Sequence, residues 1–195
     1  MENSKKTSTL IIGIILLIAI ISGISYAWLV WSKDTKIEGT SKCFDITYKG
    51  GSDISANLVL VDTPISSGKI TYGYNMASSS FAITLNNSCD TTGKFNLILK
   101  NTTVPTAYIS GNSKNALKYA LVSGSSVSVG SSYTVLASGN INTTSDINIY
   151  TSTLSKGVTN NYVLIVYVDG NSAGEDSKGT SYSGYVTADA VQTLS

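Results

Sequence analysis

Three serine–lysine neighbours are the residues in this chain whose types could support nucleophilic catalysis: Ser113-Lys114, Ser155-Lys156 and Ser177-Lys178. A lysine can activate a serine when both side chains are held together in a shielded site. All three pairs lie in stretches rich in Gly, Asn, Ser and Thr, which are typical of turns. The sequence therefore favours solvated loop residues over a Ser–Lys dyad, and it predicts no catalytic residue.

The lack of histidine excludes the commonest catalytic and metal-binding sites. None of the 195 residues is a histidine, so Ser–His–Asp and Cys–His catalysis are not available. A histidine-based zinc site is excluded for the same reason. The only glutamates after residue 27 are Glu38 and Glu175, and both lie in expected loops rather than in the cleft that paired catalytic carboxylates need. The chain is therefore predicted not to be an enzyme and to carry no cofactor.

One acidic loop partly resembles a calcium-binding loop. Asp169 and Asn171 stand at its first and third positions and Gly174 stands at its sixth, as in a calcium loop. However, the fifth position is Ala173 and the twelfth is Thr180, where a calcium loop ends in a bidentate glutamate. A simple turn after a strand is favoured, and no metal ligand is predicted.

The charge of the chain argues against a nucleic-acid partner. Charged residues make up 13% of the sequence, compared with about 25% in an average soluble protein. From Trp28 onward, 11 lysines balance 11 acidic residues. Nucleic-acid binding requires a basic surface that neutralises phosphates, so no nucleic-acid partner is expected.

The N-terminal region has the three-part layout of a signal peptide. Two lysines precede an aliphatic run, Leu10–Ile21. Ser25 and Ala27 supply the small residues at positions −3 and −1 of a cut before Trp28, as signal peptidase requires. Residues 1–27 are therefore expected to be a signal peptide, with signal peptidase as a partner.

The same region is also long enough to remain in the membrane. Residues 10–31 form an uncharged span of 22 residues, and about 20 apolar residues suffice to cross a bilayer as a helix. Trp28 and Trp31 would then be interfacial anchors. Both interpretations keep Lys5 and Lys6 in the cytoplasm and place the chain after residue 32 outside. The protein is predicted to be extracellular or on the cell surface, and anchored in the membrane if it is not cleaved.

The rest of the chain has the alternation that is typical of strands with one buried face. It is clearest in Cys43–Lys49, Phe81–Leu85, Lys94–Lys100 and Leu117–Leu121. Tyr162–Val168 is apolar on both faces and is expected to be a central strand. Further candidate strands are Asn57–Val61, Tyr133–Leu136, Ile147–Tyr150 and Tyr185–Gln192.

These short strands predict an all-β fold. Clusters of Gly, Asn and Ser separate them, and no stretch after residue 32 sustains a helical period. Residues 42–195 are expected to form an antiparallel β-sandwich of the jelly-roll kind. One N-terminal hydrophobic helix, either signal peptide or anchor, precedes it.

Two cysteines, Cys43 and Cys89, fall on the predicted extracellular side. An even number of cysteines in an oxidising compartment favours a disulfide. It would close a loop of roughly 45 residues and contribute about 3–4 kcal/mol. Two buried free thiols are the alternative.

The N-terminal arrangement resembles the export segment of the TasA/camelysin family of Gram-positive bacteria. The likeness covers about residues 5–34 and rests on the lysines, the aliphatic run and the step Gly-Ile-Ser-Tyr-Ala-Trp at residues 23–28. It implies cleavage by a SipW-type signal peptidase and a jelly-roll sandwich. It also implies export to the cell surface or biofilm matrix and assembly into fibres.

The resemblance further implies a role for residues 28–41 as a linker or donor segment. Trp28, Val30 and Trp31 would place apolar side chains in the groove of a neighbouring copy, in a homo-oligomer or fibre. The function expected first is therefore a non-enzymatic structural or matrix protein. The alternative is a membrane-anchored extracellular binding module for a glycan or a protein.

Overall fold

The computed structural model describes residues 36–38, 44–57, 60–61, 64–87 and 92–192. The described residues all belong to one compact unit, Lys36–Ser195. The expected signal peptide or membrane helix, the cleavage residues Ser25, Ala27 and Trp28, the assembly residues Val30 and Trp31, and both Cys43 and Cys89 lie outside the described residues. In the described part, no helix is long and apolar enough to span a bilayer.

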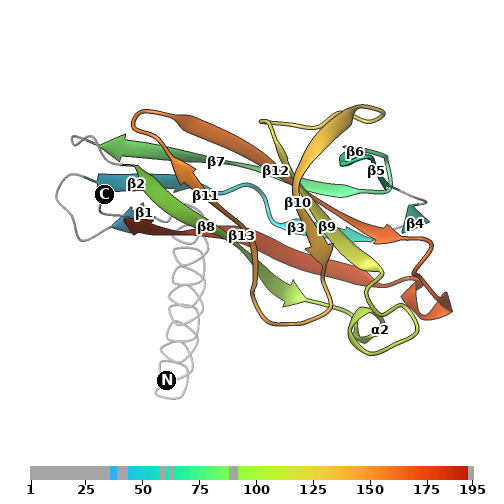
Figure 1. The fold of residues 1–195 in the computed structure, drawn as a ribbon. Coiled ribbons are helices and arrows are strands. Elements are labelled where there is room, and N and C mark those ends of the chain that lie inside the picture. Colours follow the sequence, from blue (N-terminus) through green and yellow to red (C-terminus); the bar gives the residue numbers. More distant parts are fainter. Residues whose placement is uncertain (1–35, 39–43, 58–59, 62–63, 88–91, 193–195) are drawn as a thin grey trace, which may run out of the picture. The chain divides into compact units, whose positions relative to one another are not determined.

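The larger of two sheets has the spatial order β1-β2-β7-β12-β9-β10-β6-β5 (Figure 1). Its strands are β1 (Lys36–Glu38), β2 (Phe44–Lys49), β5 (Ile65–Ser66), β6 (Lys69–Thr71), β7 (Ala77–Asn87), β9 (Leu117–Ser123), β10 (Ser132–Asn140) and β12 (Thr159–Asp169). The short strand β4 (Leu60–Val61) pairs in parallel with the end of β12. Every other pairing in the described residues is antiparallel.

The smaller sheet has the order β11-β8-β13-β3. Its strands are β3 (Ile54–Asn57), β8 (Gly93–Thr103), β11 (Ile147–Leu154) and β13 (Ser181–Gln192). Helix in the described part is confined to α2 (Thr106–Ile109) and the 3-10 turn η1 (Glu175–Ser177). The prediction of a mostly β protein with two antiparallel, sandwich-like sheets is confirmed.

The inner faces of the two sheets share one apolar core. Phe81, Ile83 and Leu85 of β7 are buried in the same cluster as residues of β8, as the period of two predicts. The rings of Phe81 and Tyr162 stack with their centroids 5.8 Å apart, and the Phe95 centroid of the opposite sheet lies 6.1 Å from that of Tyr162. Aromatic packing of this kind joins the sheets across the middle of the domain.

Two core tyrosines keep their hydroxyl groups paired. Tyr48 of β2 donates to the carbonyl oxygen of Val186 on the opposite sheet, and the Tyr182 hydroxyl donates to Asn101 Oδ1 at 2.9 Å. Burial raises the pKa of both tyrosines above the ordinary value. Because a buried hydroxyl is costly without a partner, these contacts allow tyrosine to serve as a core residue.

A second apolar cluster covers the outer face of the larger sheet. It contains Val163, Ile165 and Tyr167 of β12, together with Ala120 and Val122 of β9. The prediction that β9 has one wet face is therefore wrong, because these side chains are buried beneath the small hairpin β5–β6. Because the β5–β6 hairpin also covers Val163, Ile165 and Tyr167, the strand β12 is apolar on both faces.

The covering hairpin turns at two residues with positive φ. Ser67 has φ 51° and Gly68 has φ 72°, which is the combination that a two-residue type I′ hairpin needs. Ile70 of β6 then points into the outer cluster and is fully buried. The hairpin covers only part of the outer face, and the uncovered part holds a polar pocket.

Candidate functional site

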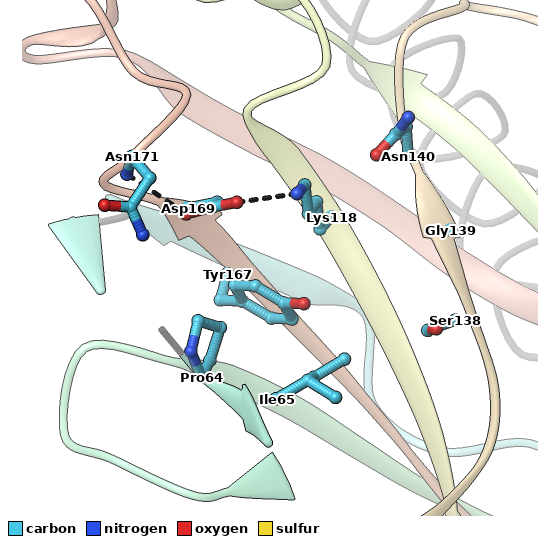
Figure 2. A pocket seen from close by; sticks show the side chains of 9 residues that line it. All are labelled: Pro64, Ile65, Lys118, Ser138, Gly139, Asn140, Tyr167, Asp169 and Asn171. Atoms are coloured by element: carbon cyan, nitrogen blue, oxygen red, sulfur yellow. Dashed lines mark hydrogen bonds and ion pairs between the residues drawn. The ribbon is translucent and has the colours of Figure 1, made fainter. Parts of the chain in front are cut away.

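A polar pocket of about 300 Å³ lies on the outer face of the larger sheet (Figure 2). It is lined by Pro64, Ile65, Lys118, Ser138, Gly139, Asn140, Tyr167, Asp169 and Asn171. Strands β9, β10 and β12 supply most of these residues, and the start of β5 supplies the apolar wall (Figure 2). The volume is at the lower end of the range of about 300–1,000 Å³ for small-molecule sites.

Strand register brings the polar residues together. Asn140 of β10 pairs with Lys118 of β9, and Lys118 pairs with Tyr167 of β12. The three side chains therefore stand in one row across adjacent strands. Residues 118, 140 and 167 are distant in sequence, so only the pairing of the strands places them side by side.

A β-bulge in β10 turns the side chains of Ser138 and Asn140 toward this face. The register of β10 on β9 shifts between Val135 and Ala137. Val135 packs in the outer cluster, whereas Ala137 packs against the inner core. The bulge reverses the faces of the strand, so Ser138 and Asn140 point outward. Without it they would point into the core.

An ion pair fixes the charge of the pocket. Lys118 Nζ lies 2.6 Å from Asp169 Oδ2, and Asp169 Oδ1 accepts the backbone N–H of Asn171 at 3.1 Å. Burial opposes ionisation of Asp169, but the hydrogen bonds from Lys118 and Asn171 outweigh it and hold the pKa of this carboxyl below its ordinary value. The pocket therefore contains one positive and one negative group that neutralise each other.

Tyr167 contributes a buried hydroxyl to the floor of the pocket. The residue is 2% exposed, and burial, followed by the neighbouring charge of Asp169, raises the pKa of Tyr167 to about 12. In contrast to Tyr48 and Tyr182, its hydroxyl has no hydrogen-bond partner among the residues that the structure describes. Figure 2 shows the ring between Pro64 and Lys118.

The rim of the pocket mixes polar and apolar groups. Ser138, Asn140 and Asn171 are exposed, whereas Pro64 and Ile65 are half-buried. Hydroxyl and carboxamide side chains both donate and accept hydrogen bonds. The pocket can therefore bind a ligand that has hydroxyl groups on its edges and an apolar face.

The serine–lysine neighbours do not form dyads in two of the three cases. The Ser113 hydroxyl donates to Asp176 Oδ1 at 2.5 Å, and the Ser177 hydroxyl donates to the carbonyl oxygen of Gly174 at 2.7 Å. Lys178 pairs with Glu175 instead. The third pair, at residues 155 and 156, lies in the exposed turn between β11 and β12. The hydroxyls of Ser113 and Ser177 therefore hold loops together.

The acidic loop after β12 uses its carboxylates on protein donors. Asp169 binds Lys118, whereas Asp176 accepts the Ser113 hydroxyl and, at 2.7 Å, the backbone N–H of Asn112. These hydrogen bonds, that of Ser113 first, lower the pKa of Asp176. Within the described ranges, no three His, Cys, Asp or Glu side chains gather closely enough to hold a metal ion.

The first described strand lies within the range expected as linker or donor. Strand β1 pairs with β2 at the edge of the larger sheet, with Lys36 opposite Thr47, Ile37 opposite Ile46 and Glu38 opposite Asp45. The sheet thus begins before residue 42, inside the range 28–41.

The polar pocket is not among the sites that the sequence predicts. A signal for it exists in β10, where the apolar alternation of Tyr133 and Val135 gives way to Ala137 and Gly139. That break marks the bulge, although its partner strands are not evident from the sequence.

Comparisons with known proteins give a distant structural likeness and no family match. No protein-family model matches the chain, and no curated protein matches it. Among solved structures, the chain is similar to the enzymatically active domain of tailspike protein 4 of bacteriophage CBA120, with 11% sequence identity and a TM-score of 0.26. The match covers 78% of this chain and 20% of that one, so this chain spans about a fifth of the length of the tailspike chain.

Proposed function

We propose that this protein is an exported, non-enzymatic structural subunit of a cell surface or biofilm matrix. In this role its two sheets form a jelly-roll-like sandwich that follows a signal peptide, residues 1–27. Copies of the chain associate through the segment that follows the cut, and Trp28, Val30 and Trp31 pack into the groove of a neighbour. The partner is a second copy of the same chain.

The observation that supports the proposal most is the position of β1. This strand has only three residues, and it lies at the edge of the larger sheet, inside the range 28–41 that is expected as linker or donor segment. An edge strand leaves one side of its backbone available for pairing. Strand addition at such an edge is an established mode of association between β proteins. Assembly would require only a short edge strand to exchange between copies.

The architecture of the domain is consistent with a structural role. The chain passes from one sheet to the other at β2–β3, β3–β4, β7–β8, β8–β9, β10–β11, β11–β12 and β12–β13. Repeated crossing of this kind ties the two sheets together through the core. A domain linked in this way can carry load between neighbours without separating into its sheets.

Electron microscopy of the secreted protein tests assembly. Protein purified from the medium or cell surface of the producing cells should form fibres when it is concentrated, as seen by negative staining. The double variant Trp28→Ser/Trp31→Ser should remain monomeric, because the apolar side chains that fill the neighbour's groove are lost. Tyr74→Ser is the matched control, since Tyr74 is 89% exposed and lies in the folded domain; it should form fibres normally. Monomeric wild-type protein at high concentration would exclude the fibre role.

The polar pocket favours a second candidate function, a membrane-anchored binding module for a glycan or protein. In that case residues 10–31 remain as a helix in the bilayer and the domain presents its pocket outside. The two candidates differ in the N-terminal residue of the protein on cells. It is Trp28 for the matrix subunit and the original N-terminus for the anchored module.

A further inference from the structure

The hydroxyl of Tyr167 is a buried polar group without a partner among the described residues. The residue is 2% exposed. Buried polar groups in native proteins are nearly always hydrogen-bonded, and an exception calls for an explanation. Phenylalanine would fill the same space without an unpaired hydroxyl. The tyrosine is therefore explained best by a partner that enters the pocket from outside.

The charges in the pocket point to a neutral ligand. Lys118 and Asp169 lie 2.6 Å apart and are largely shielded, with side chains 29% and 13% exposed. An anionic ligand at Lys118 would also meet the charge of Asp169, and a cationic ligand at Asp169 would also meet the charge of Lys118. A charged ligand therefore gains little from a pair that is already neutralised, and separating the partly buried pair would be strongly unfavourable. A neutral ligand leaves the ion pair intact and can still accept hydrogen bonds from the remaining N–H groups of Lys118.

The uncharged groups around the pair fit a polyhydroxyl ligand. Asn140 and Asn171 each offer a donor and an acceptor from opposite sides of the pocket (Figure 2), and Ser138 adds a hydroxyl that does both. Each sugar hydroxyl also donates and accepts, so such groups satisfy one another. Pro64 and Ile65 form an apolar wall on a third side, suited to the C–H face of a sugar ring.

We propose that this pocket binds one neutral sugar residue, with the Tyr167 hydroxyl and the Asn140 carboxamide as its polar contacts and Pro64 and Ile65 against its ring. The volume of about 300 Å³ suits a single ring with solvent, at the low end of ligand pockets. The sugar is either free or a unit of a longer glycan. Binding of this kind goes beyond the matrix role and does not depend on assembly, because the pocket lies on β9, β10 and β12 and not on β1.

Saturation-transfer NMR on the full chain tests the proposal. The chain is dispersed in a zwitterionic detergent, because detergents with sugar head groups would compete. The probes are the neutral sugars glucose, galactose, mannose and N-acetylglucosamine, each also offered as a short oligomer. Glucuronate, glucosamine and glycine are the charged comparison compounds. The variants are Asn140→Ala and Tyr167→Phe, with Asn148→Ala and Tyr74→Phe as matched controls on other parts of the surface.

At least one neutral sugar should show saturation transfer from the wild-type chain. Its affinity should fall about 3- to 10-fold in Asn140→Ala and in Tyr167→Phe, the loss expected for one hydrogen bond, and should not change in either control. Stronger binding of an oligomer than of its monomer would identify a glycan unit as the source, and equal binding would identify the free sugar. The proposal is overturned if no neutral sugar binds, if the charged compounds bind better, or if binding persists unchanged in both pocket variants. Asn140 is exposed, so its variant remains informative even if Tyr167→Phe alters the fold.

Discussion

Lys118 and Tyr167 stand opposite each other on β9 and β12, yet the ammonium of Lys118 bonds to Asp169 and leaves the Tyr167 hydroxyl without a partner. The pocket therefore has one satisfied charged pair beside one unsatisfied neutral group. Stability and ligand binding should respond differently to changes at these residues.

Asp169→Asn should destabilise the domain by about 1–3 kcal/mol at neutral pH, because it removes a partly shielded, charge-assisted hydrogen bond. The folded-state pKa of Asp169 is lowered, so its contribution is present above the unfolded carboxyl pKa of about 3.9. That contribution is lost as the pH falls from there through the folded pKa. Thermal unfolding followed by circular dichroism should show a gap between wild type and variant at pH 7 that narrows in acid.

The control for this prediction is Asp146→Asn. Asp146 pairs with Lys100, but their side chains are 52% and 35% exposed, and exposed pairs are usually worth less than about 1 kcal/mol. An equal loss at both sites, or a gap at Asp169 that does not change with pH, would contradict the role given to the Lys118–Asp169 pair.

Tyr167→Phe should leave the melting temperature unchanged or raise it, because the hydroxyl that it removes is buried and unpaired. Tyr182→Phe should instead cost about 1 kcal/mol, since its hydroxyl bonds to Asn101 at 2.9 Å. Both changes remove one oxygen atom from a buried tyrosine, so each is the control for the other. A clear loss of stability in Tyr167→Phe would mean that the hydroxyl has a structural partner.

Gly139→Ala should destabilise the domain by about 1–3 kcal/mol through overpacking. A Cβ at residue 139 would lie 2.8 Å from the hydroxyl oxygen of Tyr119 and 2.9 Å from its ring. Adding Tyr119→Phe should restore part of the loss, because one of the two close contacts disappears. Gly73→Ala is the control, as a Cβ there meets nothing within 4 Å, and it should be nearly neutral in thermal unfolding.

Cys43 and Cys89 should form a disulfide in the exported protein. Both cysteines lie outside the described residues. However, Phe44, the first residue of β2, is paired in register with Asn87, the last residue of β7. Intact-mass measurement after alkylation without reduction should find no alkyl group on either cysteine. Reduction should then lower stability by about 3–4 kcal/mol. Alkylation of the native protein at both residues would favour free thiols.

Local patterns were sufficient to predict the inner core. Alternation along β8 identified Phe95, Leu97 and Leu99 as one buried face, and the structure buries all three. The continuous apolar run of β12 correctly indicated a strand covered on both sides. These features depend only on residues that are close together along one strand, which is why alternation and a continuous apolar run identify them.

The outer face could not be predicted in the same way. Strands β5 and β6 have two and three residues, too few for a period to show, although Ser67-Gly68 is a recognisable turn. The pocket depends on the register of β10 against β9, including a bulge, and on a turn that holds Asn171 near β12. These features depend on pairings between residues that are far apart in the chain, and no local pattern in the sequence predicts which strands pair or in what register.

The N-terminal residue of the protein made by its own cells is the most direct test of the proposed role as an exported matrix subunit. Intact-mass and peptide mass spectrometry should be applied separately to the membrane fraction and to the cell-surface or secreted fraction. The matrix role predicts a chain that begins at Trp28 and is enriched outside the membrane. An Ala27→Lys variant, which blocks the small-residue position at the cut, should retain residues 1–27 and stay in the membrane fraction. A wild-type chain that keeps residues 1–27 and remains in the membrane would contradict the matrix role and favour the anchored binding module.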